Sequence, residues 1–584
     1  MRRFVLGFFA TIGVLVIVLL LAGGGFFFWS RWTADRVAGN TVLTLDLTAP
    51  FPDTPPAGGV GALLFPGRRP LRDVLDAIAR AGDDPRVTGL IAHLGGDDFG
   101  IAQVQELRDA IIAFRAKGKH ATAFAESFGE FGPGTRSYYL ATAFDDIWLQ
   151  PLGLVGLIGL SAEEPFFRGT FDKLGIVPRF DHREQYKTAM NMLTETAMTP
   201  AHREETTAIL ASDEDQIVSG IAAGRKLDPA TVRTLIDRGP LMTEEALTAH
   251  LIDHIGYEDE ATAALRARLG GRAHLMKWDD YLDAAGRPNR QGPVIALIYA
   301  DGLITTAGGR GNPVTGSQVL SAARVVKAFN EAARDPKVRA ILFRIDSPGG
   351  SVVASEAIWR ATVAAERAGK PVIASMGDVA GSGGYYIAAA ADKIVAEPGT
   401  LTGSIGVLAG KFLIGGLSGK LGVTWDGAAV GKDAAMFSPI EDFTPAEHDR
   451  FEAFLDQVYD GFKAHVAQGR KMSAEAVEAV AKGRVWTGAD AKTHGLVDAL
   501  GGYQTALALA KSAAHLPAAQ PVTLELVPAP HDTARTLLAR ALGHAETGSG
   551  AGSLADLATL AEPLIARLQS MTAGALVMPP LGLH

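Results

Sequence analysis

The sequence predicts an α/β fold made of two similar halves, each a mainly parallel sheet with helices between its strands. Two observations lead to this prediction. Short apolar runs of strand length alternate with helical patterns of about 10 to 20 residues, which is typical of βαβ units. In addition, a series of short motifs recurs in the same order about 250 residues further along the chain, which is typical of a tandem duplication.

The duplication is visible in paired motifs. Residues 84–87 (DPRV) correspond to 335–338 (DPKV), and each group follows a helical pattern and precedes a buried strand. The later pairs keep the order: 138–139 (YY) with 385–386 (YY), 174–175 (LG) with 421–422 (LG), and 199–200 (TP) with 444–445 (TP). The halves meet near residues 286–293 (GRPNRQGP), whose Gly, Pro and polar content is typical of a linker.

We therefore divide the chain into five parts: an N-terminal segment 1–32, a first half 40–270, a linker 271–293, a second half 294–515 and a tail 516–584. Within the second half the patterns predict these elements: strand 294–299, helix 318–333, strand 339–345, helix 353–368, strand 371–375, helix 383–391 and strand 393–396. Functional groups of parallel sheets gather where strands end and helices begin. The turns after residues 345 and 375 are therefore the places to search for a site.

Composition excludes several classes of function. The chain has 584 residues, of which 47% are apolar and 20% charged, as expected for globular domains. Its formal net charge is −9 and it has no dense Lys/Arg block, which argues against a nucleic-acid partner. It has no cysteine, which excludes disulfides, thiolate nucleophiles and Cys-based metal sites.

Residues 4–29 form an apolar run of 26 residues with Thr11 as its one polar side chain. At 1.5 Å per residue a helix of this length spans about 39 Å, enough to cross a bilayer. A cleaved signal peptide is the alternative, but the run is long and ends in Phe28 and Trp29 rather than in a small-residue cleavage site. We expect an uncleaved anchor that contacts the lipid bilayer, with its N-terminus on the cytoplasmic side.

Two glycine-rich turns of the second half fall at strand ends. Residues 346–351 read DSPGGS, and residues 380–386 read AGSGGYY before an apolar helix pattern. A serine such as Ser382 at a helix start beside glycines is sterically open, and the Gly383 N–H lies where an oxyanion would form. The alternative for Ser382 is an ordinary helix N-cap.

A nucleophilic serine needs a base. The histidines are scattered, and His250 and His494, which correspond by duplication, sit in polar, helix-like stretches. A lysine can serve if burial lowers its pKa. Lys187 and Lys432 each precede the proline of their half's Thr-Pro pair by 13 residues, so they are counterparts and both are candidates.

With DSPGGS, GSGGYY, 401–407 (LTGSIGV) and 485–501 (VWTGADAKTHGLVDALG), the chain resembles the signal peptide peptidase A (protease IV) family in its long, two-half form. The resemblance covers roughly residues 40 to 512. It implies a tandem Clp-protease/crotonase-like α/β fold and a membrane-anchored Ser/Lys endopeptidase that degrades signal peptides left in the membrane. It also implies a homotetramer whose catalytic body lies on the periplasmic side of the inner membrane.

By this resemblance Ser382 is the nucleophile. The base of the long form comes from the first half, at the position of Lys187, and that of the short form from the position of Lys432. We expect Lys187, with Lys432 as the alternative. In the first half Arg136 stands where Gly383 stands in the second half, so we expect that half to have lost its nucleophile site.

The expected mechanism is acyl transfer by Ser382, with the N–H groups of Gly383 and Gly350 holding the oxyanion. No metal or nucleotide cofactor is expected, since the sequence has no Walker-type motif. Three alternatives are a membrane-associated protease with other protein substrates, an acyl-CoA hydratase or isomerase of the crotonase-like fold, and a peptide-binding scaffold without activity.

Overall fold

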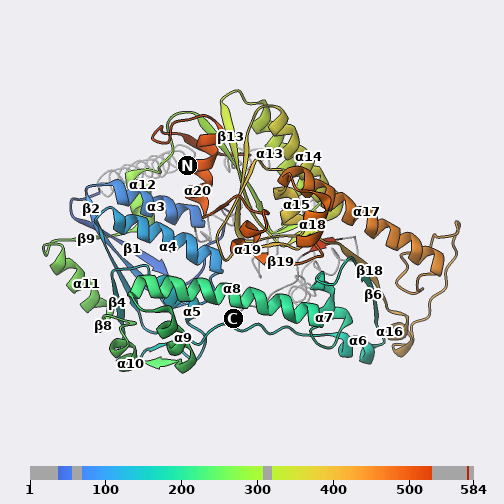
Figure 1. Ribbon diagram of the computed structural model, residues 1–584, viewed down its shortest axis with the longest axis horizontal. Helices are drawn as coiled ribbons and strands as arrows, with labels where there is room; N and C mark the ends of the chain where they lie inside the picture. Colours follow the sequence, from blue (N-terminus) through green and yellow to red (C-terminus); the bar gives the residue numbers. More distant parts are fainter. Residues whose placement is uncertain (1–36, 55–68, 307–318, 529–574, 578–584) are drawn as a thin grey trace, which may run out of the picture.

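The computed structural model describes residues 37–54, 69–306 and 319–528 and the backbone of residues 575–577. The chain forms two α/β halves that lie side by side (Figure 1). Most of the first half, in blue and green, is at the left, its residues 168–194 extend to the lower right, and the second half, in yellow and orange, is above and to the right. The predicted α/β class and the predicted order of two similar units are both found.

The first half is built on a six-stranded parallel sheet in the order β8-β4-β3-β2-β1-β9. Its strands are β1 (Thr41–Leu47), β2 (Val87–Leu94), β3 (His120–Ala125), β4 (Asp146–Leu149), β8 (His254–Ile255) and β9 (His274–Lys277), with a separate pair of β5 (Leu154–Val155) and β7 (Leu241–Met242). Its helices are α3 (Leu71–Asp83), α4 (Ile101–Ala116), α5 (Thr135–Ala141), α6 (Arg168–Leu174), η1 (Thr188–Met190), α7 (Asn191–Thr194), α8 (Pro200–Arg225), α9 (Pro229–Arg238), α10 (Thr243–Thr248), α11 (Glu258–Arg268) and α12 (Trp278–Ala285).

The second half has an eight-stranded sheet with the order β19-β17-β15-β13-β10-β21; β16 also pairs with β15, and β20 pairs with β16. Its strands are β10 (Val294–Asp301), β13 (Val338–Ser347), β15 (Val372–Gly381), β16 (Lys393–Ala396), β17 (Leu401–Gly403), β19 (Val485–Thr487), β20 (Ala499–Leu500) and β21 (Thr523–Leu526). Its helices are α13 (Ala322–Arg334), α14 (Val352–Arg367), α15 (Gly383–Ala388), α16 (Gly415–Lys420), α17 (Pro445–Arg470), α18 (Ala474–Val480), α19 (Gly488–Thr493) and α20 (Tyr503–Ala513).

A third sheet joins the two halves. Its order is β12-β11-β14-β22-β18-β6, from β11 (Leu303–Thr305), β12 (Val319–Ser321), β14 (Gly349–Ser351), β18 (Leu408–Leu413), β22 (Ala575–Val577) and β6 (Val177–His182). Only β6 comes from the first half. It pairs antiparallel with β18 over six residue pairs, from Val177 with Leu413 to His182 with Leu408. The residues of the first half that follow β6 therefore begin directly beside the second half.

The second sheet also shares a core with the first half. Successive side chains of a strand point to opposite faces. On β10, Ile295 and Leu297 lie in the core that contains α3 and α4 of the first half, whereas Ala296 and Ile298 lie in the second half's own core. The two halves are therefore packed on one another through apolar side chains and are not separated by a flexible linker.

A buried ion network crosses the same interface. The guanidinium of Arg344, which is 4% exposed, donates to both oxygens of Asp53 at 3.1 Å and lies 2.7 Å from Glu106. Both carboxylates belong to the first half. Because buried charges without partners are very unfavourable, this contact requires the two halves to keep one relative position.

The structure corrects several predicted boundaries. Residues 274–285, predicted as linker, form β9 and α12, which belong to the first half because β9 pairs with β1 and α12 packs on α3. The helix predicted over 318–333 begins at Ala322, since 319–321 pair with β11 as a strand. Strand β21, predicted as tail, pairs with β10 and extends the second half to about residue 526.

The predicted membrane anchor, residues 4–29, lies outside the described residues. Among the helices that the structure does describe, none is both long enough and apolar enough to cross a membrane.

Candidate active site

Ser382 lies in the sharp turn between β15 and α15. Its φ of 54° and ψ of −114° are a conformation that residues other than glycine rarely adopt. The turn is held by its backbone, since the N–H of Ser382 donates to Gly403 O and the N–H of Tyr386 donates to Ser382 O, both at 2.8 Å. Ser382 occupies the N-cap position of α15, but its side chain makes no capping hydrogen bond. A strained strand-to-helix turn of this kind presents a nucleophile in many hydrolases.

Lys187 reaches Ser382 from the other half of the chain. It follows β6 after four residues and directly precedes η1. The preceding residue, Tyr186, donates its backbone N–H to Lys482 O at 3.1 Å, so the segment is tied to the second half on this side as well. The pairing of β6 with β18 and this hydrogen bond together place the lysine stem beside the serine turn.

The Nζ atom of Lys187 lies 2.7 Å from the Oγ of Ser382. Nζ also donates to the backbone O and the Oγ of Ser404, each at 3.0 Å. All three residues are fully buried. Ser404 therefore fixes the position of the amine, while Ser382 is the third group around it.

Burial lowers the pKa of Lys187 well below its ordinary value, because an apolar environment disfavours the ammonium form. Glu205, when it is ionised, acts in the opposite direction and is the smaller influence on the pKa of Lys187. Glu205, on α8, is itself fully buried and accepts the backbone N–H of Val485 at 2.9 Å. Burial raises its pKa to about 8. The site thus holds a lysine that loses its proton easily and a carboxyl group that keeps its proton to an unusually high pH.

The stem of Lys187 is packed between two glycines. A Cβ atom on Gly483 would lie 2.5 Å from the backbone N of Lys187, and a Cβ on Gly406 would lie 3.1 Å from its Cδ. Gly483 also has a φ of +78°, which glycine adopts without strain. Gly483 leaves room for Lys187 only because it carries no side chain, and a side chain at position 406 would crowd the lysine stem.

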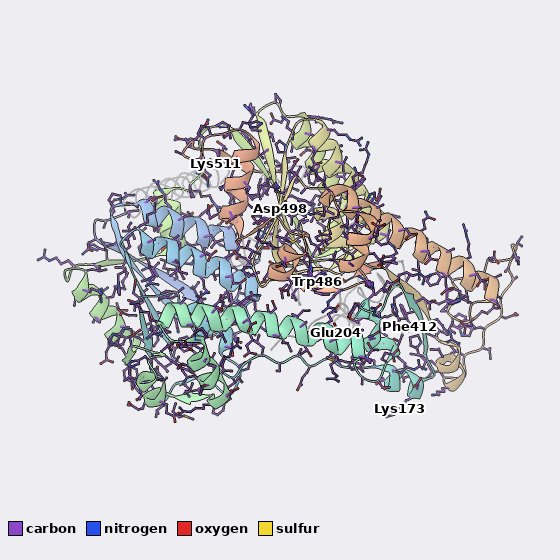
Figure 2. The ribbon with its side chains drawn as sticks, viewed as in Figure 1. Lys173, Glu204, Phe412, Trp486, Asp498 and Lys511 are labelled. Carbon is purple, nitrogen blue, oxygen red and sulfur yellow. The ribbon has the colours of Figure 1, made fainter. Side chains whose placement is uncertain are left out.

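Three half-buried residues and the exposed Glu204 close the outer edge of the site. The Arg484 guanidinium stacks over the rings of Tyr186 and Trp486, 4.8 and 4.6 Å from their centroids, and donates to Glu204 at 2.9 Å. Figure 2 shows Glu204 on α8 below Trp486. Because Tyr186 precedes Lys187, this cluster holds the lysine segment from the solvent side.

The predicted oxyanion glycines lie close to one another. A Cβ atom on Gly383 would lie 3.1 Å from the backbone N of Gly350 and 3.0 Å from the Cα of Gly349. At Gly350, a Cβ would lie 2.2 Å from Ile304 O, so a side chain is excluded there. The structure therefore brings the two glycine-rich turns together beside Ser382.

The structure places Lys432 elsewhere. It lies in an exposed turn between α16 and α17, whereas Ser382 is fully buried against Lys187. Of the two candidate bases, only Lys187 contacts the serine.

The equivalent position in the first half is filled by the protein's own groups. The carboxylate of Asp97 accepts the backbone N–H groups of Arg136 and Ser137, both at 2.8 Å, and the Arg136 side chain donates to Phe99 O at 2.9 Å. A carboxylate on these N–H groups occupies the place that an oxyanion would take. This geometry agrees with the expectation that the first half has lost its nucleophile site.

Two further residues of the site, Ser404 and Glu205, were not assigned a role from sequence. Ser404 lies in the motif 401–407, which could have suggested it. Glu205 gave no signal, because nothing in the surrounding sequence of α8 distinguishes it from other acidic helix residues. In the described part of the chain, no group of three or more His, Asp or Glu side chains is arranged to hold a metal ion.

Comparison with known proteins decides the family. The model of peptidase family S49 matches residues 113–270 and again residues 364–517, once in each half. The chain belongs to peptidase family S49. It is therefore a serine peptidase, and the two matches support the duplication seen in the sequence.

Individual S49 relatives match over most of the chain. The chloroplastic serine protease SPPA of Arabidopsis thaliana is 33% identical over 84% of this chain and 71% of its own length. Protease 4 of Salmonella typhi is 32% identical over 81% of this chain and 78% of its own length. Protease 4 of Haemophilus influenzae is 29% identical over 74% of this chain and 71% of its own.

Proposed function

We propose that this S49 peptidase is a membrane-anchored endopeptidase that uses a Ser382/Lys187 dyad to degrade signal peptides left in the membrane. The observation that carries the proposal is the 2.7 Å contact between Lys187 Nζ and Ser382 Oγ in a fully buried site. Burial lowers the pKa of Lys187 and so favours its neutral amine, which is the form that can accept the serine proton.

The reaction then follows from the geometry. Neutral Lys187 takes the proton of Ser382, whose Oγ attacks the peptide carbonyl. The N–H groups of Gly383 and Gly350 stabilise the negative charge on the tetrahedral oxygen. Lys187 returns the proton to the leaving amine, and water activated by the same lysine hydrolyses the acyl-enzyme. Ser404 orients the amine through both steps.

The substrate class rests on the resemblance to signal peptide peptidase A and on the apolar run at residues 4–29, which would keep the enzyme where such peptides remain. We propose a single-pass protein of the inner membrane, with a cytoplasmic N-terminus, a periplasmic or other extracytoplasmic catalytic body, and a homotetrameric assembly. Lipid contact would be made through residues 4–29. A membrane-associated protease with other protein substrates is the second candidate, because the same dyad would cut any extended peptide.

The test uses the full chain in detergent with a synthetic signal peptide, a fluorogenic apolar peptide and an intact single-pass membrane protein. Ser382→Ala should lower cleavage by a factor of about 10³ or more. Ser219→Ala, on the exposed face of α8, is the matched control and should behave as wild type.

Fragments of the signal peptide, identified by mass spectrometry, with an intact membrane protein left uncut, would support the substrate class. Preferential cutting of the membrane protein would favour the second candidate. Wild-type rates in Ser382→Ala would refute the mechanism.

A further inference from the structure

A cavity lies between the two halves, bounded by α3 and α4 of the first half and by the start of α20 in the second half (Figure 1). Its volume of about 370 Å³ is within the range of small-ligand sites, about 300 to 1,000 Å³. The second half contributes Glu397 and residues 502–505 to its wall. None of the residues that line the cavity belongs to the dyad or to the turns around Ser382.

Most of the cavity's surface is apolar. Leu75, Ile78 and Phe114 line it from the first half, and all three are buried. Ala110 and Ala113, three residues apart on α4, lie on one face of that helix and leave space in front of their short side chains. This part of the cavity is suited to a branched aliphatic or aromatic group.

Carboxyl groups form the polar part of the wall. Glu106 and Glu397 are buried, whereas Asp109 is exposed and marks the mouth of the cavity. Among the described residues, Oε1 of Glu397 has no hydrogen-bond partner, although the side chain is only 1% exposed, and the buried hydroxyl of Tyr503 has none either. Buried polar groups are nearly always paired. These two groups are therefore placed for a partner that the described part of the chain does not supply.

The cavity is also short of positive charge. The guanidinium of Arg344 is shared between Asp53 and Glu106. Burial raises the pKa of Glu397 well above its ordinary value, and the charges of Glu106 and Asp109 raise it further. A cation beside Glu397 would favour its ionised form and relieve this repulsion.

An organic cation fits these groups better than a metal ion does. In the described part of the chain, no three His, Asp or Glu side chains are arranged to hold a metal. An ammonium group has three donors, which can reach carboxyl groups that lie apart, while an apolar body attached to it contacts the apolar wall. Lys117, at the mouth, does not supply this cation, because it pairs with Asp83 at 2.8 Å.

We propose that this cavity binds a small apolar primary amine, with its ammonium group on Glu397 and its hydrocarbon part beside Ala110. A free amine and the N-terminus of an apolar peptide share this chemistry. Since both halves line the cavity, a bound amine stabilises the arrangement that places Lys187 beside Ser382. The inference goes beyond the proposed function, because it concerns binding at a separate site.

The experiment measures binding to full-length Ser382→Ala in detergent by isothermal titration calorimetry, so that no cleavage contributes. The probes are isopentylamine, as a free amine, and leucine amide, which has the charge and side chain of a peptide N-terminus. N-acetyl-leucine amide, which has no charge, is the ligand control. We expect saturable binding of at least one amine, a rise in Tm of about 2 °C near saturation, and no binding of the acetylated compound.

Two variants in the same background locate the site. Glu397→Gln keeps the size of the side chain but removes its charge, and Ala110→Phe fills the cavity, so each should weaken binding at least about tenfold. The control for the first is Glu366→Gln on α14, which also has a buried carboxyl oxygen without a partner among the described residues but lies outside the cavity. The control for the second is Ala116→Phe at the exposed end of α4. Both controls should bind the amine as the parent does.

Three results would overturn the inference: no saturable binding of either amine up to about 20 mM, equal binding of the acetylated compound, or unchanged affinity in a folded cavity variant. If one cavity variant does not fold, the other decides. A wild-type chain that cleaves no peptide would refute the proposed function and leave amine binding unaffected. An active enzyme that binds neither amine would refute this inference alone.

Discussion

Burial gives Lys187 its proposed reactivity and makes the folded protein's stability depend on pH. An unfolded lysine has a pKa near 10.4, whereas the folded pKa of Lys187 is well below that. Between the two values the unfolded chain binds one proton more than the folded chain, so stability increases with pH in this window. At a pH below the folded pKa of Lys187, burial of the lysine destabilises the folded protein to its full extent. At a pH above the unfolded pKa, this destabilisation has disappeared.

We predict that Lys187→Met removes this pH dependence. Between the lowered pKa of folded Lys187 and its unfolded pKa, wild type should gain about 1.4 kcal/mol of unfolding free energy per pH unit relative to the variant. Urea unfolding at several pH values measures the difference. In parallel, wild-type kcat/KM should rise with pH through the lowered pKa of Lys187 and then level off. Parallel stability curves for the two proteins would show that Lys187 is charged when folded.

At the scale of single residues, motif and position were enough to select Ser382 and Lys187, because the duplication aligns each lysine with its counterpart. Motif and position alone could not distinguish Lys187 from Lys432. The difference between the two is burial, which depends on the pairing of β6 with a strand more than 200 residues away. Ser404 and Glu205 act through contacts distant in sequence, and for the same reason no local pattern identifies their roles.

At the scale of elements, the loop between α18 and β19 leaves room for Lys187 only because residue 483 is glycine. Gly369 offers a matched control, since it has the same φ of +78° but nothing within 4 Å of a Cβ placed on it.

We predict that Gly483→Ala and Gly369→Ala each destabilise the fold by about 1 kcal/mol or more, since alanine is strained at this φ. Only Gly483→Ala should also lower kcat, by about 100-fold, because it displaces the backbone of Lys187. Thermal unfolding and steady-state kinetics of the two variants measure both effects. Equal kcat values in the two variants would show that the position of Lys187 does not depend on this loop.

The elements also show where sequence patterns were insufficient. The central strands β10, β13 and β15 are long apolar runs, and they were found with errors only at their ends. Short strands such as β9, β12 and β22 were missed, because three or four residues carry no clear period, and the partners of β9 and β22 are far along the chain. Residues 274–285 looked like linker for this reason, although they complete the first half.

At the scale of the whole molecule, the active site exists only because the two halves are held in one arrangement. Three contacts between distant parts of the chain maintain it: the shared apolar core beneath β10, the network of Arg344 with Asp53 and Glu106, and the pairing of β6 with β18. The duplication was readable from sequence. The pairing of β6 with the sheet strand β18 of the second half could not be read from sequence, because it depends on how the two halves pack and not on the sequence of either repeat. The first half, whose own oxyanion position is filled by Asp97, would contribute the base through this exchanged segment.

The central claim is that the first half's lysine activates the second half's serine. Its most direct test is covalent labelling of the full chain by a fluorophosphonate, which reacts only with an activated serine, followed by intact-mass and peptide mass spectrometry. We predict one label on Ser382 in wild type and in Lys432→Met, no label in Ser382→Ala, and a labelling rate at least 100-fold lower in Lys187→Met. Loss of labelling in Lys432→Met, with wild-type labelling in Lys187→Met, would contradict the account and assign the base to the second half.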